Sequence, residues 1–160
     1  MYNFDLIKPK TLADAVAALE GGAQPLSGGQ TLLPTMKQRL ADPGTLVSLT
    51  SIPELQGVCQ GDGGVIVGGA TPHAVVAKEA QKYYPALAAL AGQIGDPAVR
   101  NRGTIGGSIA NNDPSACYPA AALGSGAIIV TNNREVAADD YFLGMFETAL
   151  EEGEIVIAVK

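Results

Sequence analysis

The sequence has 160 residues, of which 47% are hydrophobic, so it is long and apolar enough for one ordinary domain or for two small lobes that share a core. Its 10 basic and 16 acidic side chains give a net charge of −6 without any Lys/Arg run, which argues against binding to nucleic acid or to an anionic membrane surface. No stretch is long and apolar enough for a membrane span or a signal peptide, and neither Cys59 nor Cys117 has a Cys or His at metal-site spacing. Composition therefore predicts a cytoplasmic domain with reduced cysteines and no metal of its own.

The first fifty residues predict a small βαβ unit. Thr11 followed by Asp14 is typical of a helix N-terminus, and the pair Gly21-Gly22 is typical of a helix end. The glycines and apolar spacing that follow predict a strand, a glycine turn, a helix and a second strand. The predicted elements are a helix over 12–20, a strand over 24–27, a helix over 32–40 and a strand over 45–49.

The rest of the chain predicts mainly antiparallel strands with short helices. The turns 61–64 and 132–133 are rich in Gly, Asp or Asn and lie between extended runs, as in hairpins. An acidic pair predicts a cap for a helix over 141–150. The remaining predicted elements are helices over 71–81, 85–91 and 114–123, and strands over 55–60, 65–68, 127–131, 135–137 and 154–159. The predicted fold class is α+β, with a βαβ lobe over 1–52 and a mainly antiparallel lobe over 53–160.

A glycine turn at the end of the first predicted strand has the features of an anion site. Gly28 and Gly29 turn the chain into a helix, which leaves backbone N–H groups unpaired and no Cβ to block a ligand. Ser27 and Thr31 add hydroxyl donors, but the stretch is neither a Walker A loop nor a dinucleotide fingerprint. The alternative interpretation is an ordinary tight turn. The candidate residues are Ser27, Gly28, Gly29, Gln30, Thr31 and Leu32.

A second polar, glycine-rich stretch lies within 95–113, where the sequence shows little periodicity. Two glycines interrupt a run over 104–110 that we interpret as a strand, and such glycines often mark a bulge or a ligand lying against the backbone. Arg100 and Arg102 are candidates for screening phosphate charge or for pairing with carboxylates. The alternative interpretation is a surface loop. The candidate residues are Thr104, Ile105, Gly106, Gly107 and Ser108. Two such stretches in an acidic chain favour a phosphate-bearing ligand held mainly by backbone amides.

These two stretches resemble the two FAD-pyrophosphate loops of the flavin-binding medium subunit of molybdenum hydroxylases. The resemblance is to the carbon monoxide dehydrogenase medium-subunit type, which is related to the flavin domain of xanthine dehydrogenase. It runs from Tyr2 to Lys160, and the segments 94–101 and 137–147 support it. It is far more specific than either glycine pair alone, because two long motifs occur in the right order.

The resemblance implies a two-lobed FAD-binding fold of the vanillyl-alcohol-oxidase type, with FAD between the lobes. The two glycine-rich stretches would be its main contacts, and Cys117 stands where relatives often carry an acidic residue that contacts FAD. In relatives this subunit passes electrons from a [2Fe-2S] small subunit through FAD to an external acceptor, while a molybdopterin-binding large subunit oxidises the substrate. The implied assembly is a heterotrimer, alone or dimerised. A C-terminal subdomain of relatives is absent from these 160 residues.

Two other functions stay open on the sequence. The first is a non-catalytic nucleotide-binding or assembly module that has lost flavin, which the change to Cys117 favours. The second is a stand-alone flavin oxidase, which the lack of Trp and of a substrate domain disfavours. No side chain is assigned as a catalytic acid, base or nucleophile. His73 is expected in a first helical turn as a surface or packing residue, and Cys59 as a small buried hydrophobe.

Overall fold

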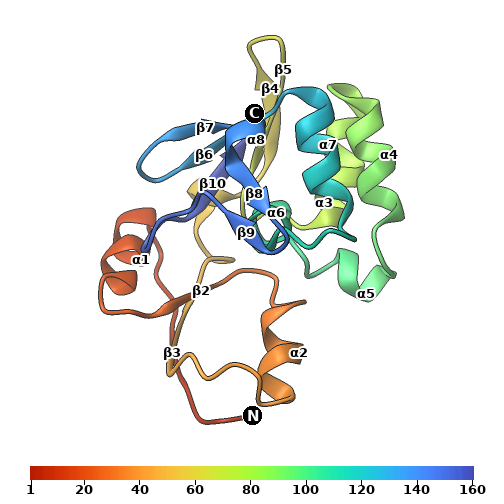
Figure 1. Ribbon diagram of the computed structural model, residues 1–160. Coiled ribbons are helices and arrows are strands. Elements are labelled where there is room, and N and C mark those ends of the chain that lie inside the picture. Colours follow the sequence, from red (N-terminus) through yellow and green to blue (C-terminus); the bar gives the residue numbers. More distant parts are fainter.

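The computed structural model describes residues 1–160 and contains two main sheets of different kinds (Figure 1). A three-stranded parallel sheet with the order β1-β3-β2 lies toward the N-terminus. A five-stranded antiparallel sheet with the order β4-β5-β10-β6-β7 follows, and a two-stranded hairpin, β8-β9, stands apart from both. The mixed helix and strand content is the one that the sequence predicts.

The parallel sheet contains the predicted βαβ unit, which is confirmed. The structure adds a strand that the sequence did not predict, since β1 pairs with β3 in parallel. Thr11 caps the first helix, and its Oγ1 accepts a hydrogen bond from the N–H of Asp14 (3.1 Å). The elements are β1 (Asp5–Ile7), α1 (Leu12–Leu19), β2 (Gln24–Leu26), α2 (Leu32–Lys37) and β3 (Thr45–Ser48).

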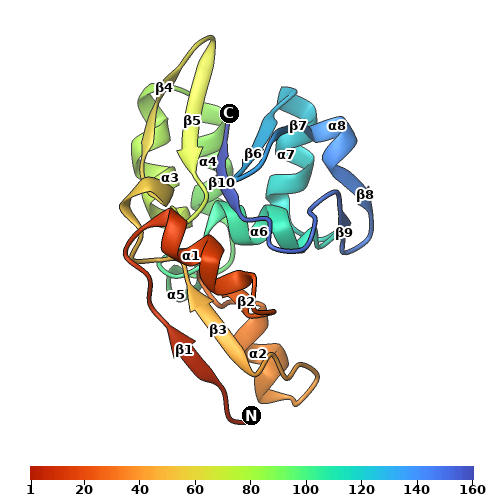
Figure 2. The same ribbon diagram turned by 90° about the vertical axis from the view of Figure 1, so that its left-hand side faces the viewer.

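The antiparallel sheet contains both predicted hairpins, and its central strand is the last one in the sequence. β10 lies between β5 and β6, which brings the end of the chain into the middle of the sheet (Figure 2). Since β10 is preceded directly by 149–155, that segment is carried to the sheet end that faces the N-terminal part. The strands are β4 (Val58–Gly61), β5 (Gly64–Gly68), β6 (Ile128–Thr131), β7 (Glu135–Ala137) and β10 (Val156–Val159).

Helices α3, α4 and α7 gather on one face of the antiparallel sheet, as Figures 1 and 2 show from two sides. The largest cluster of buried side chains contains 16 residues and lies between these helices and the sheet. The remaining helical elements are η1 (Pro53–Leu55), α3 (His73–Glu79), η2 (Ala80–Lys82), α4 (Pro85–Gln93), α5 (Pro97–Arg100), α6 (Ile105–Asn111), α7 (Cys117–Ser125) and α8 (Ala138–Tyr141).

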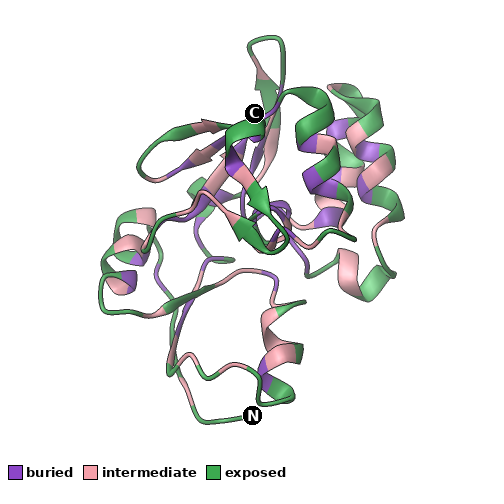
Figure 3. Ribbon diagram, in the orientation of Figure 1, coloured by how far each residue is buried: buried purple, intermediate pink, exposed green.

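Buried positions occur in the N-terminal part as well as around the antiparallel sheet (Figure 3), and a second buried cluster joins N-terminal residues to later parts of the chain. It contains 8 residues, among them Ala15 and Leu19 from α1 and Ile155 from the segment before β10. Because this cluster takes in residues from both sides of position 52, the division into lobes 1–52 and 53–160 stays a prediction. The interpretation of Cys59 as a buried residue is wrong, because Cys59 is exposed on the edge strand β4.

The interpretation of 104–110 as a strand is also wrong, since these residues form α6. The side chain of Thr104 caps the helix by accepting a hydrogen bond from the N–H of Gly107 (3.2 Å). The N–H of Gly106 donates to the carbonyl of Gly69 (2.8 Å), and a Cβ on Gly106 would lie only 2.6 Å from that oxygen. Glycine is therefore needed at position 106 because two backbone segments approach each other closely there. The stretch 95–113, in which the sequence showed little periodicity, contains the helices α5 and α6.

The predicted helix over 141–150 is replaced by α8 and by a hairpin of β8 (Phe142–Gly144) and β9 (Glu147–Thr148). Asn112 at the end of α6 holds this hairpin, because its side-chain NH₂ donates to the carbonyls of Gly144 (2.8 Å) and Glu147 (2.9 Å). Its own carbonyl accepts from the N–H of Phe146 (3.0 Å). These tertiary bonds override the local helical pattern.

Candidate functional site

The two glycine-rich stretches, 77 positions apart in the chain, touch each other in the structure. The Oγ of Ser27 and the Oγ1 of Thr104 form a hydrogen bond of 2.7 Å. Gly28 lies directly against the backbone of Arg102 and Gly103, and a Cβ on Gly28 would overlap the Arg102 carbonyl oxygen and lie 2.6 Å from the Gly103 Cα. Glycine at 28 is therefore required by the approach of one loop to the other.

A cavity of about 610 Å³ opens between these loops. All of the predicted site residues line it except Ile105 and Cys117. Ile105 is only 2% exposed and packs in the main core, because the first turn of α6 points that side chain toward the sheet. Cys117 is exposed at the start of α7, outside the cavity lining. The lining residues from the sequence prediction are Ser27, Gly28, Gly29, Gln30, Thr31, Leu32, Thr104, Gly106, Gly107 and Ser108.

The first loop carries a continuous row of free backbone hydrogen-bond donors in the cavity. None of the backbone N–H groups of residues 28–32 donates a hydrogen bond within the protein. In the second loop, by contrast, the N–H groups of 105–108 are all engaged, for example from Ile105 to the Thr71 carbonyl (3.2 Å). The first loop thus offers a row of donors to an anion, while the second loop offers a hydroxyl and a surface without side chains.

No lysine or arginine side chain lines the cavity. Arg100 is held away from it, since its guanidinium donates to the carbonyls of Ile94 (3.1 Å) and Gly95 (2.8 Å). Arg102 is exposed and outside the lining. The lining carboxylates are Asp113 and Glu154, and hydrogen bonds from Ser115 hold the pKa of Asp113 below its usual range. An anionic group in this cavity would therefore be met by amides and hydroxyls rather than by cations.

His73 lines the same cavity, whereas the sequence favoured a surface or packing role over a functional one. It begins α3, as predicted, and is 5% exposed. Its backbone N–H donates to the Gly103 carbonyl (2.9 Å), and its ring centroid lies 5.3 Å from that of Tyr118. Burial lowers the pKa of His73 to about 4, and its Nδ1 has no hydrogen-bond partner. The imidazole is therefore neutral near pH 7, and His73 packs against the residues that precede the second loop.

We expect this histidine to make the folded state less stable in mild acid. Its pKa is lower when folded than when unfolded, so the unfolded state binds the extra proton as the pH falls below about 6.5. Stability should therefore fall between pH 6.5 and about 4, with a limiting slope of about 1.4 kcal/mol per pH unit for one proton. Urea unfolding of wild type and His73→Gln at pH 7.0, 6.0 and 5.0 measures this.

The chain offers a clean comparison for that measurement, because His73 is its only histidine. The pKa of the buried Glu154 is lowered, mainly by its hydrogen bond from Arg134, so its contribution is lost only at more acidic pH. In His73→Gln the urea midpoint of unfolding should stay the same between pH 7.0 and 5.0. An equal slope in both proteins would show that His73 does not titrate as the structure indicates.

A larger cavity of about 780 Å³ lies among β5, α4 and α7. Its lining is mainly apolar, and Ile105 is the sole predicted site residue in it.

No group of three or more His, Cys, Asp or Glu side chains is arranged to hold a metal ion. None of the helices has the length and apolar character that crossing a membrane requires.

Sequence reasoning missed the third wall of the 610 Å³ cavity. Leu150, Glu154 and Ile155 line it from the segment before β10. These residues lie more than forty positions beyond the second loop, and their sequence carries no glycine motif. The only available signal was the predicted final strand, whose position in the sheet the sequence did not indicate.

The chain matches the family described as "FAD binding domain in molybdopterin dehydrogenase" over residues 2–160. It is 39% identical over 167 residues to the carbon monoxide dehydrogenase medium chain of Hydrogenophaga pseudoflava, a match that covers 99% of this chain and 58% of that one. It is 30% identical over 168 residues to the xanthine dehydrogenase FAD-binding subunit of Escherichia coli O157:H7, again with 99% and 58% coverage.

Solved structures agree with these matches. The chain superposes on reconstituted CO dehydrogenase from Oligotropha carboxidovorans with a TM-score of 0.93 at 38% identity. For quinoline 2-oxidoreductase from Pseudomonas putida 86 the TM-score is 0.95 at 32% identity. Each superposition covers 99% of this chain and 58% of the other. The chain thus spans little more than half the length of the relatives that it matches.

Proposed function

The chain belongs to the family of FAD-binding domains of molybdopterin dehydrogenases, which are oxidoreductases, and from this premise we propose that it binds FAD in the 610 Å³ cavity between its two glycine-rich loops. The predicted family and the predicted cofactor class are thereby confirmed. In the proposed arrangement the diphosphate lies between Gly28 and Gly107, at the contact of the two parts of the chain, as in the two-lobed vanillyl-alcohol-oxidase fold.

The observation that carries this proposal is the row of unpaired backbone N–H groups over residues 28–32. Each can donate a charge-assisted hydrogen bond to a phosphate oxygen without a cationic side chain. The Ser27 hydroxyl, held by its 2.7 Å hydrogen bond to the buried Thr104, would orient the same group from the other side. Gly107 is exposed in the cavity wall, so its backbone leaves room for the ligand.

We further propose that the domain works as the electron-transferring subunit of a molybdenum hydroxylase, with a molybdopterin-binding large subunit and a [2Fe-2S] small subunit. Bound FAD supplies the redox chemistry, taking up electrons from iron–sulfur centres and releasing them to an external acceptor. The chain's own residues bind and orient it. The β8–β9 hairpin exposes Leu143 (59%), Met145 (76%) and Phe146 (61%), an apolar surface suited to a partner subunit.

The proposal is tested by titrating the purified protein with FAD and with riboflavin, followed by flavin fluorescence. Riboflavin lacks the diphosphate and should bind at least about a hundredfold more weakly, since two charge-assisted hydrogen bonds are worth about 1.5–3 kcal/mol each. ADP, which keeps the diphosphate, should compete with FAD. Equal affinities for FAD and riboflavin would remove the first loop from the site.

The same titration separates the remaining alternatives. A colourless protein that refuses added FAD would favour the non-catalytic module. Co-purification from the native source should bring down the large and small subunits, and a lone flavoprotein that turns over an organic substrate would favour the oxidase.

A further inference from the structure

One wall of the proposed FAD cavity is an irregular segment, residues 149–155, which we call the strap. It joins β9 to β10 and belongs to no helix or strand. Leu150, Glu154 and Ile155 of the strap line the same cavity as the first glycine loop. A segment without its own backbone ladder needs outside contacts to hold one shape, so the contacts of the strap decide the shape of this wall.

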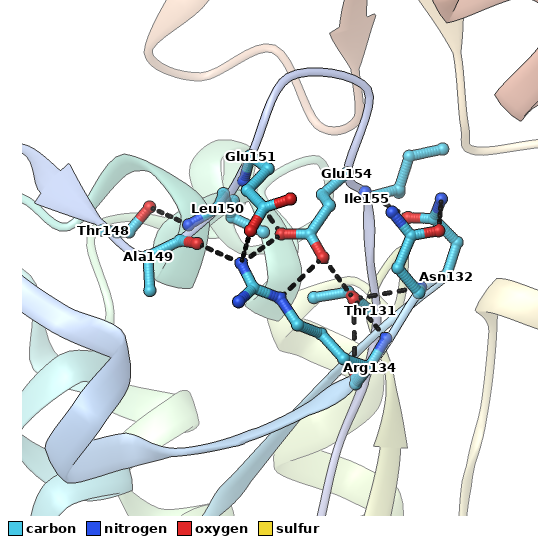
Figure 4. Close-up of polar contacts among 10 residues, drawn as sticks. Thr131, Asn132, Arg134, Thr148, Ala149, Leu150, Glu151, Glu154 and Ile155 are labelled. Atoms are coloured by element: carbon cyan, nitrogen blue, oxygen red, sulfur yellow. Dashed lines mark hydrogen bonds and ion pairs between the residues drawn. The ribbon is translucent and has the colours of Figure 1, made fainter.

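The β6–β7 turn contacts the strap through an ion pair between the exposed Arg134 and the buried Glu154 (Figure 4). The Nε of Arg134 donates to Oε1 of Glu154 and its Nη2 donates to Oε2, both at 3.0 Å, in a two-point contact. The same Nη2 donates to the carbonyl of Ala149 (2.6 Å) and pairs with Glu151 (3.1 Å). One guanidinium thus contacts both ends of the strap.

A second set of hydrogen bonds between the β6–β7 turn and the strap lies beside the ion pair (Figure 4). The Asn132 side-chain oxygen accepts from the N–H of Ile155 (2.7 Å), and the Asn132 N–H donates to the Ile155 carbonyl (3.2 Å). The Oγ1 of Thr131 lies 3.0 Å from Oε1 of Glu154, and the N–H of Glu151 donates to Oε2 (2.8 Å). Each carboxylate oxygen of Glu154 therefore has two donors.

The negative charge of Glu154 makes its pairing with Arg134 relevant to an anionic ligand. The Glu154 side chain is 1% exposed, whereas that of Arg134 is 39% exposed. Hydrogen bonds from Arg134 are the main cause that holds the pKa of Glu154 below its usual range, so the carboxylate is ionised at neutral pH. Without Arg134 a buried, unpaired negative charge would stand in the wall of a cavity that has no cationic side chain.

We propose that Arg134 and Glu154 are positioning residues for the flavin nucleotide: their ion pair holds the strap in shape and neutralises the carboxylate that would otherwise repel the diphosphate. This inference rests on the proposed function. It assigns a binding role to two residues that lie in neither glycine-rich loop.

The test compares FAD dissociation constants of wild type, Arg134→Met, Glu154→Gln and the double variant, at a temperature where far-UV CD shows all of them folded. Arg134→Met should raise the dissociation constant by about tenfold or more. The double variant should bind at least about threefold more tightly than Arg134→Met, because the bare charge is gone. Arg134→Lys, which keeps the charge but loses the two-point contact, should lie in between.

Glu135→Gln is the matched control, since it breaks the exposed pair of Glu135 with Lys160 on the neighbouring strand β7, outside the cavity. It should leave FAD affinity unchanged. Hydrogen exchange of the ligand-free protein should also show faster exchange at the strap amides in Arg134→Met, and this holds whether or not folding is weakened.

A merely structural role would lower the melting temperature and leave the FAD dissociation constant of Arg134→Met unchanged, and that result overturns the inference. Weaker binding by the double variant than by Arg134→Met, or unaltered exchange in the strap, does the same. Failure of the wild-type chain to bind FAD would instead overturn the proposed function, and this inference with it.

Discussion

Replacing Gly28 with alanine is expected to weaken both FAD binding and the fold. The added Cβ would overlap the carbonyl oxygen of Arg102 and lie 2.6 Å from the Gly103 Cα, and neither backbone atom can rotate away as a side chain would. The loops must then separate, which breaks the Ser27–Thr104 hydrogen bond. We expect a loss of stability of about 1–3 kcal/mol and at least about a tenfold rise in the FAD dissociation constant.

Urea unfolding and a flavin titration measure the two effects of Gly28→Ala separately. Gly124→Ala is the matched control, because a Cβ there meets nothing within 4 Å and Gly124 lies inside helix α7. That change should be neutral or should raise stability by up to about 1 kcal/mol, with FAD affinity unaltered. Wild-type stability and affinity in Gly28→Ala would show that the two loops do not meet as described.

Replacing Gly107 with leucine is expected to weaken FAD binding with little effect on the fold. Gly107 is exposed in the first turn of α6, and a Cβ there would lie 3.0 Å from the Thr104 Oγ1 and 3.9 Å from the Ser27 Cβ, between the two loops. A leucine side chain would occupy space proposed for the diphosphate, while leucine favours helix over glycine by up to about 1 kcal/mol. Losing one or two charge-assisted bonds of about 1.5–3 kcal/mol each raises the dissociation constant by about tenfold to ten-thousandfold.

Arg102→Ala tests whether a side chain near the second loop contributes to FAD binding. Arg102 is exposed and outside the cavity lining, so its loss should change FAD affinity much less than Gly107→Leu. Far-UV CD should be unchanged in both variants. An unaltered FAD dissociation constant in Gly107→Leu would exclude the second loop from the site, and a larger loss in Arg102→Ala would show that a side-chain clamp holds the diphosphate.

Gly28 and Gly107 also show that two similar glycine-rich stretches can differ in which of their backbone N–H groups are free. The sequence interpretation gave both loops the same role, with unpaired amides facing the ligand. In the structure the N–H groups of residues 28–32 donate no hydrogen bond within the protein, whereas those of 105–108 are engaged in the helix cap and in bonds to 69–71. The second loop is therefore proposed to act by shape and by the Thr104 hydroxyl.

Local signals in the sequence were enough for the elements that depend on neighbouring residues. The Thr11 cap, the glycine turn after β2 and the turns 61–64 and 132–133 were all predicted, because turn and cap residues restrict the backbone within a few positions. The two glycine-rich stretches were also predicted to act together, and the structure brings them into contact, although their role as one site stays a prediction.

The tertiary structure decided everything that depends on partners far along the chain. The helix over 105–111 includes Gly106, which approaches the distant Gly69, and the hairpin β8–β9 is held by Asn112, which binds its carbonyls. The burial of His73 and the pairing of Arg134 with Glu154 have the same origin. Local sequence restricts backbone dihedral angles, but packing selects which distant groups share hydrogen bonds and which amides are left free for a ligand.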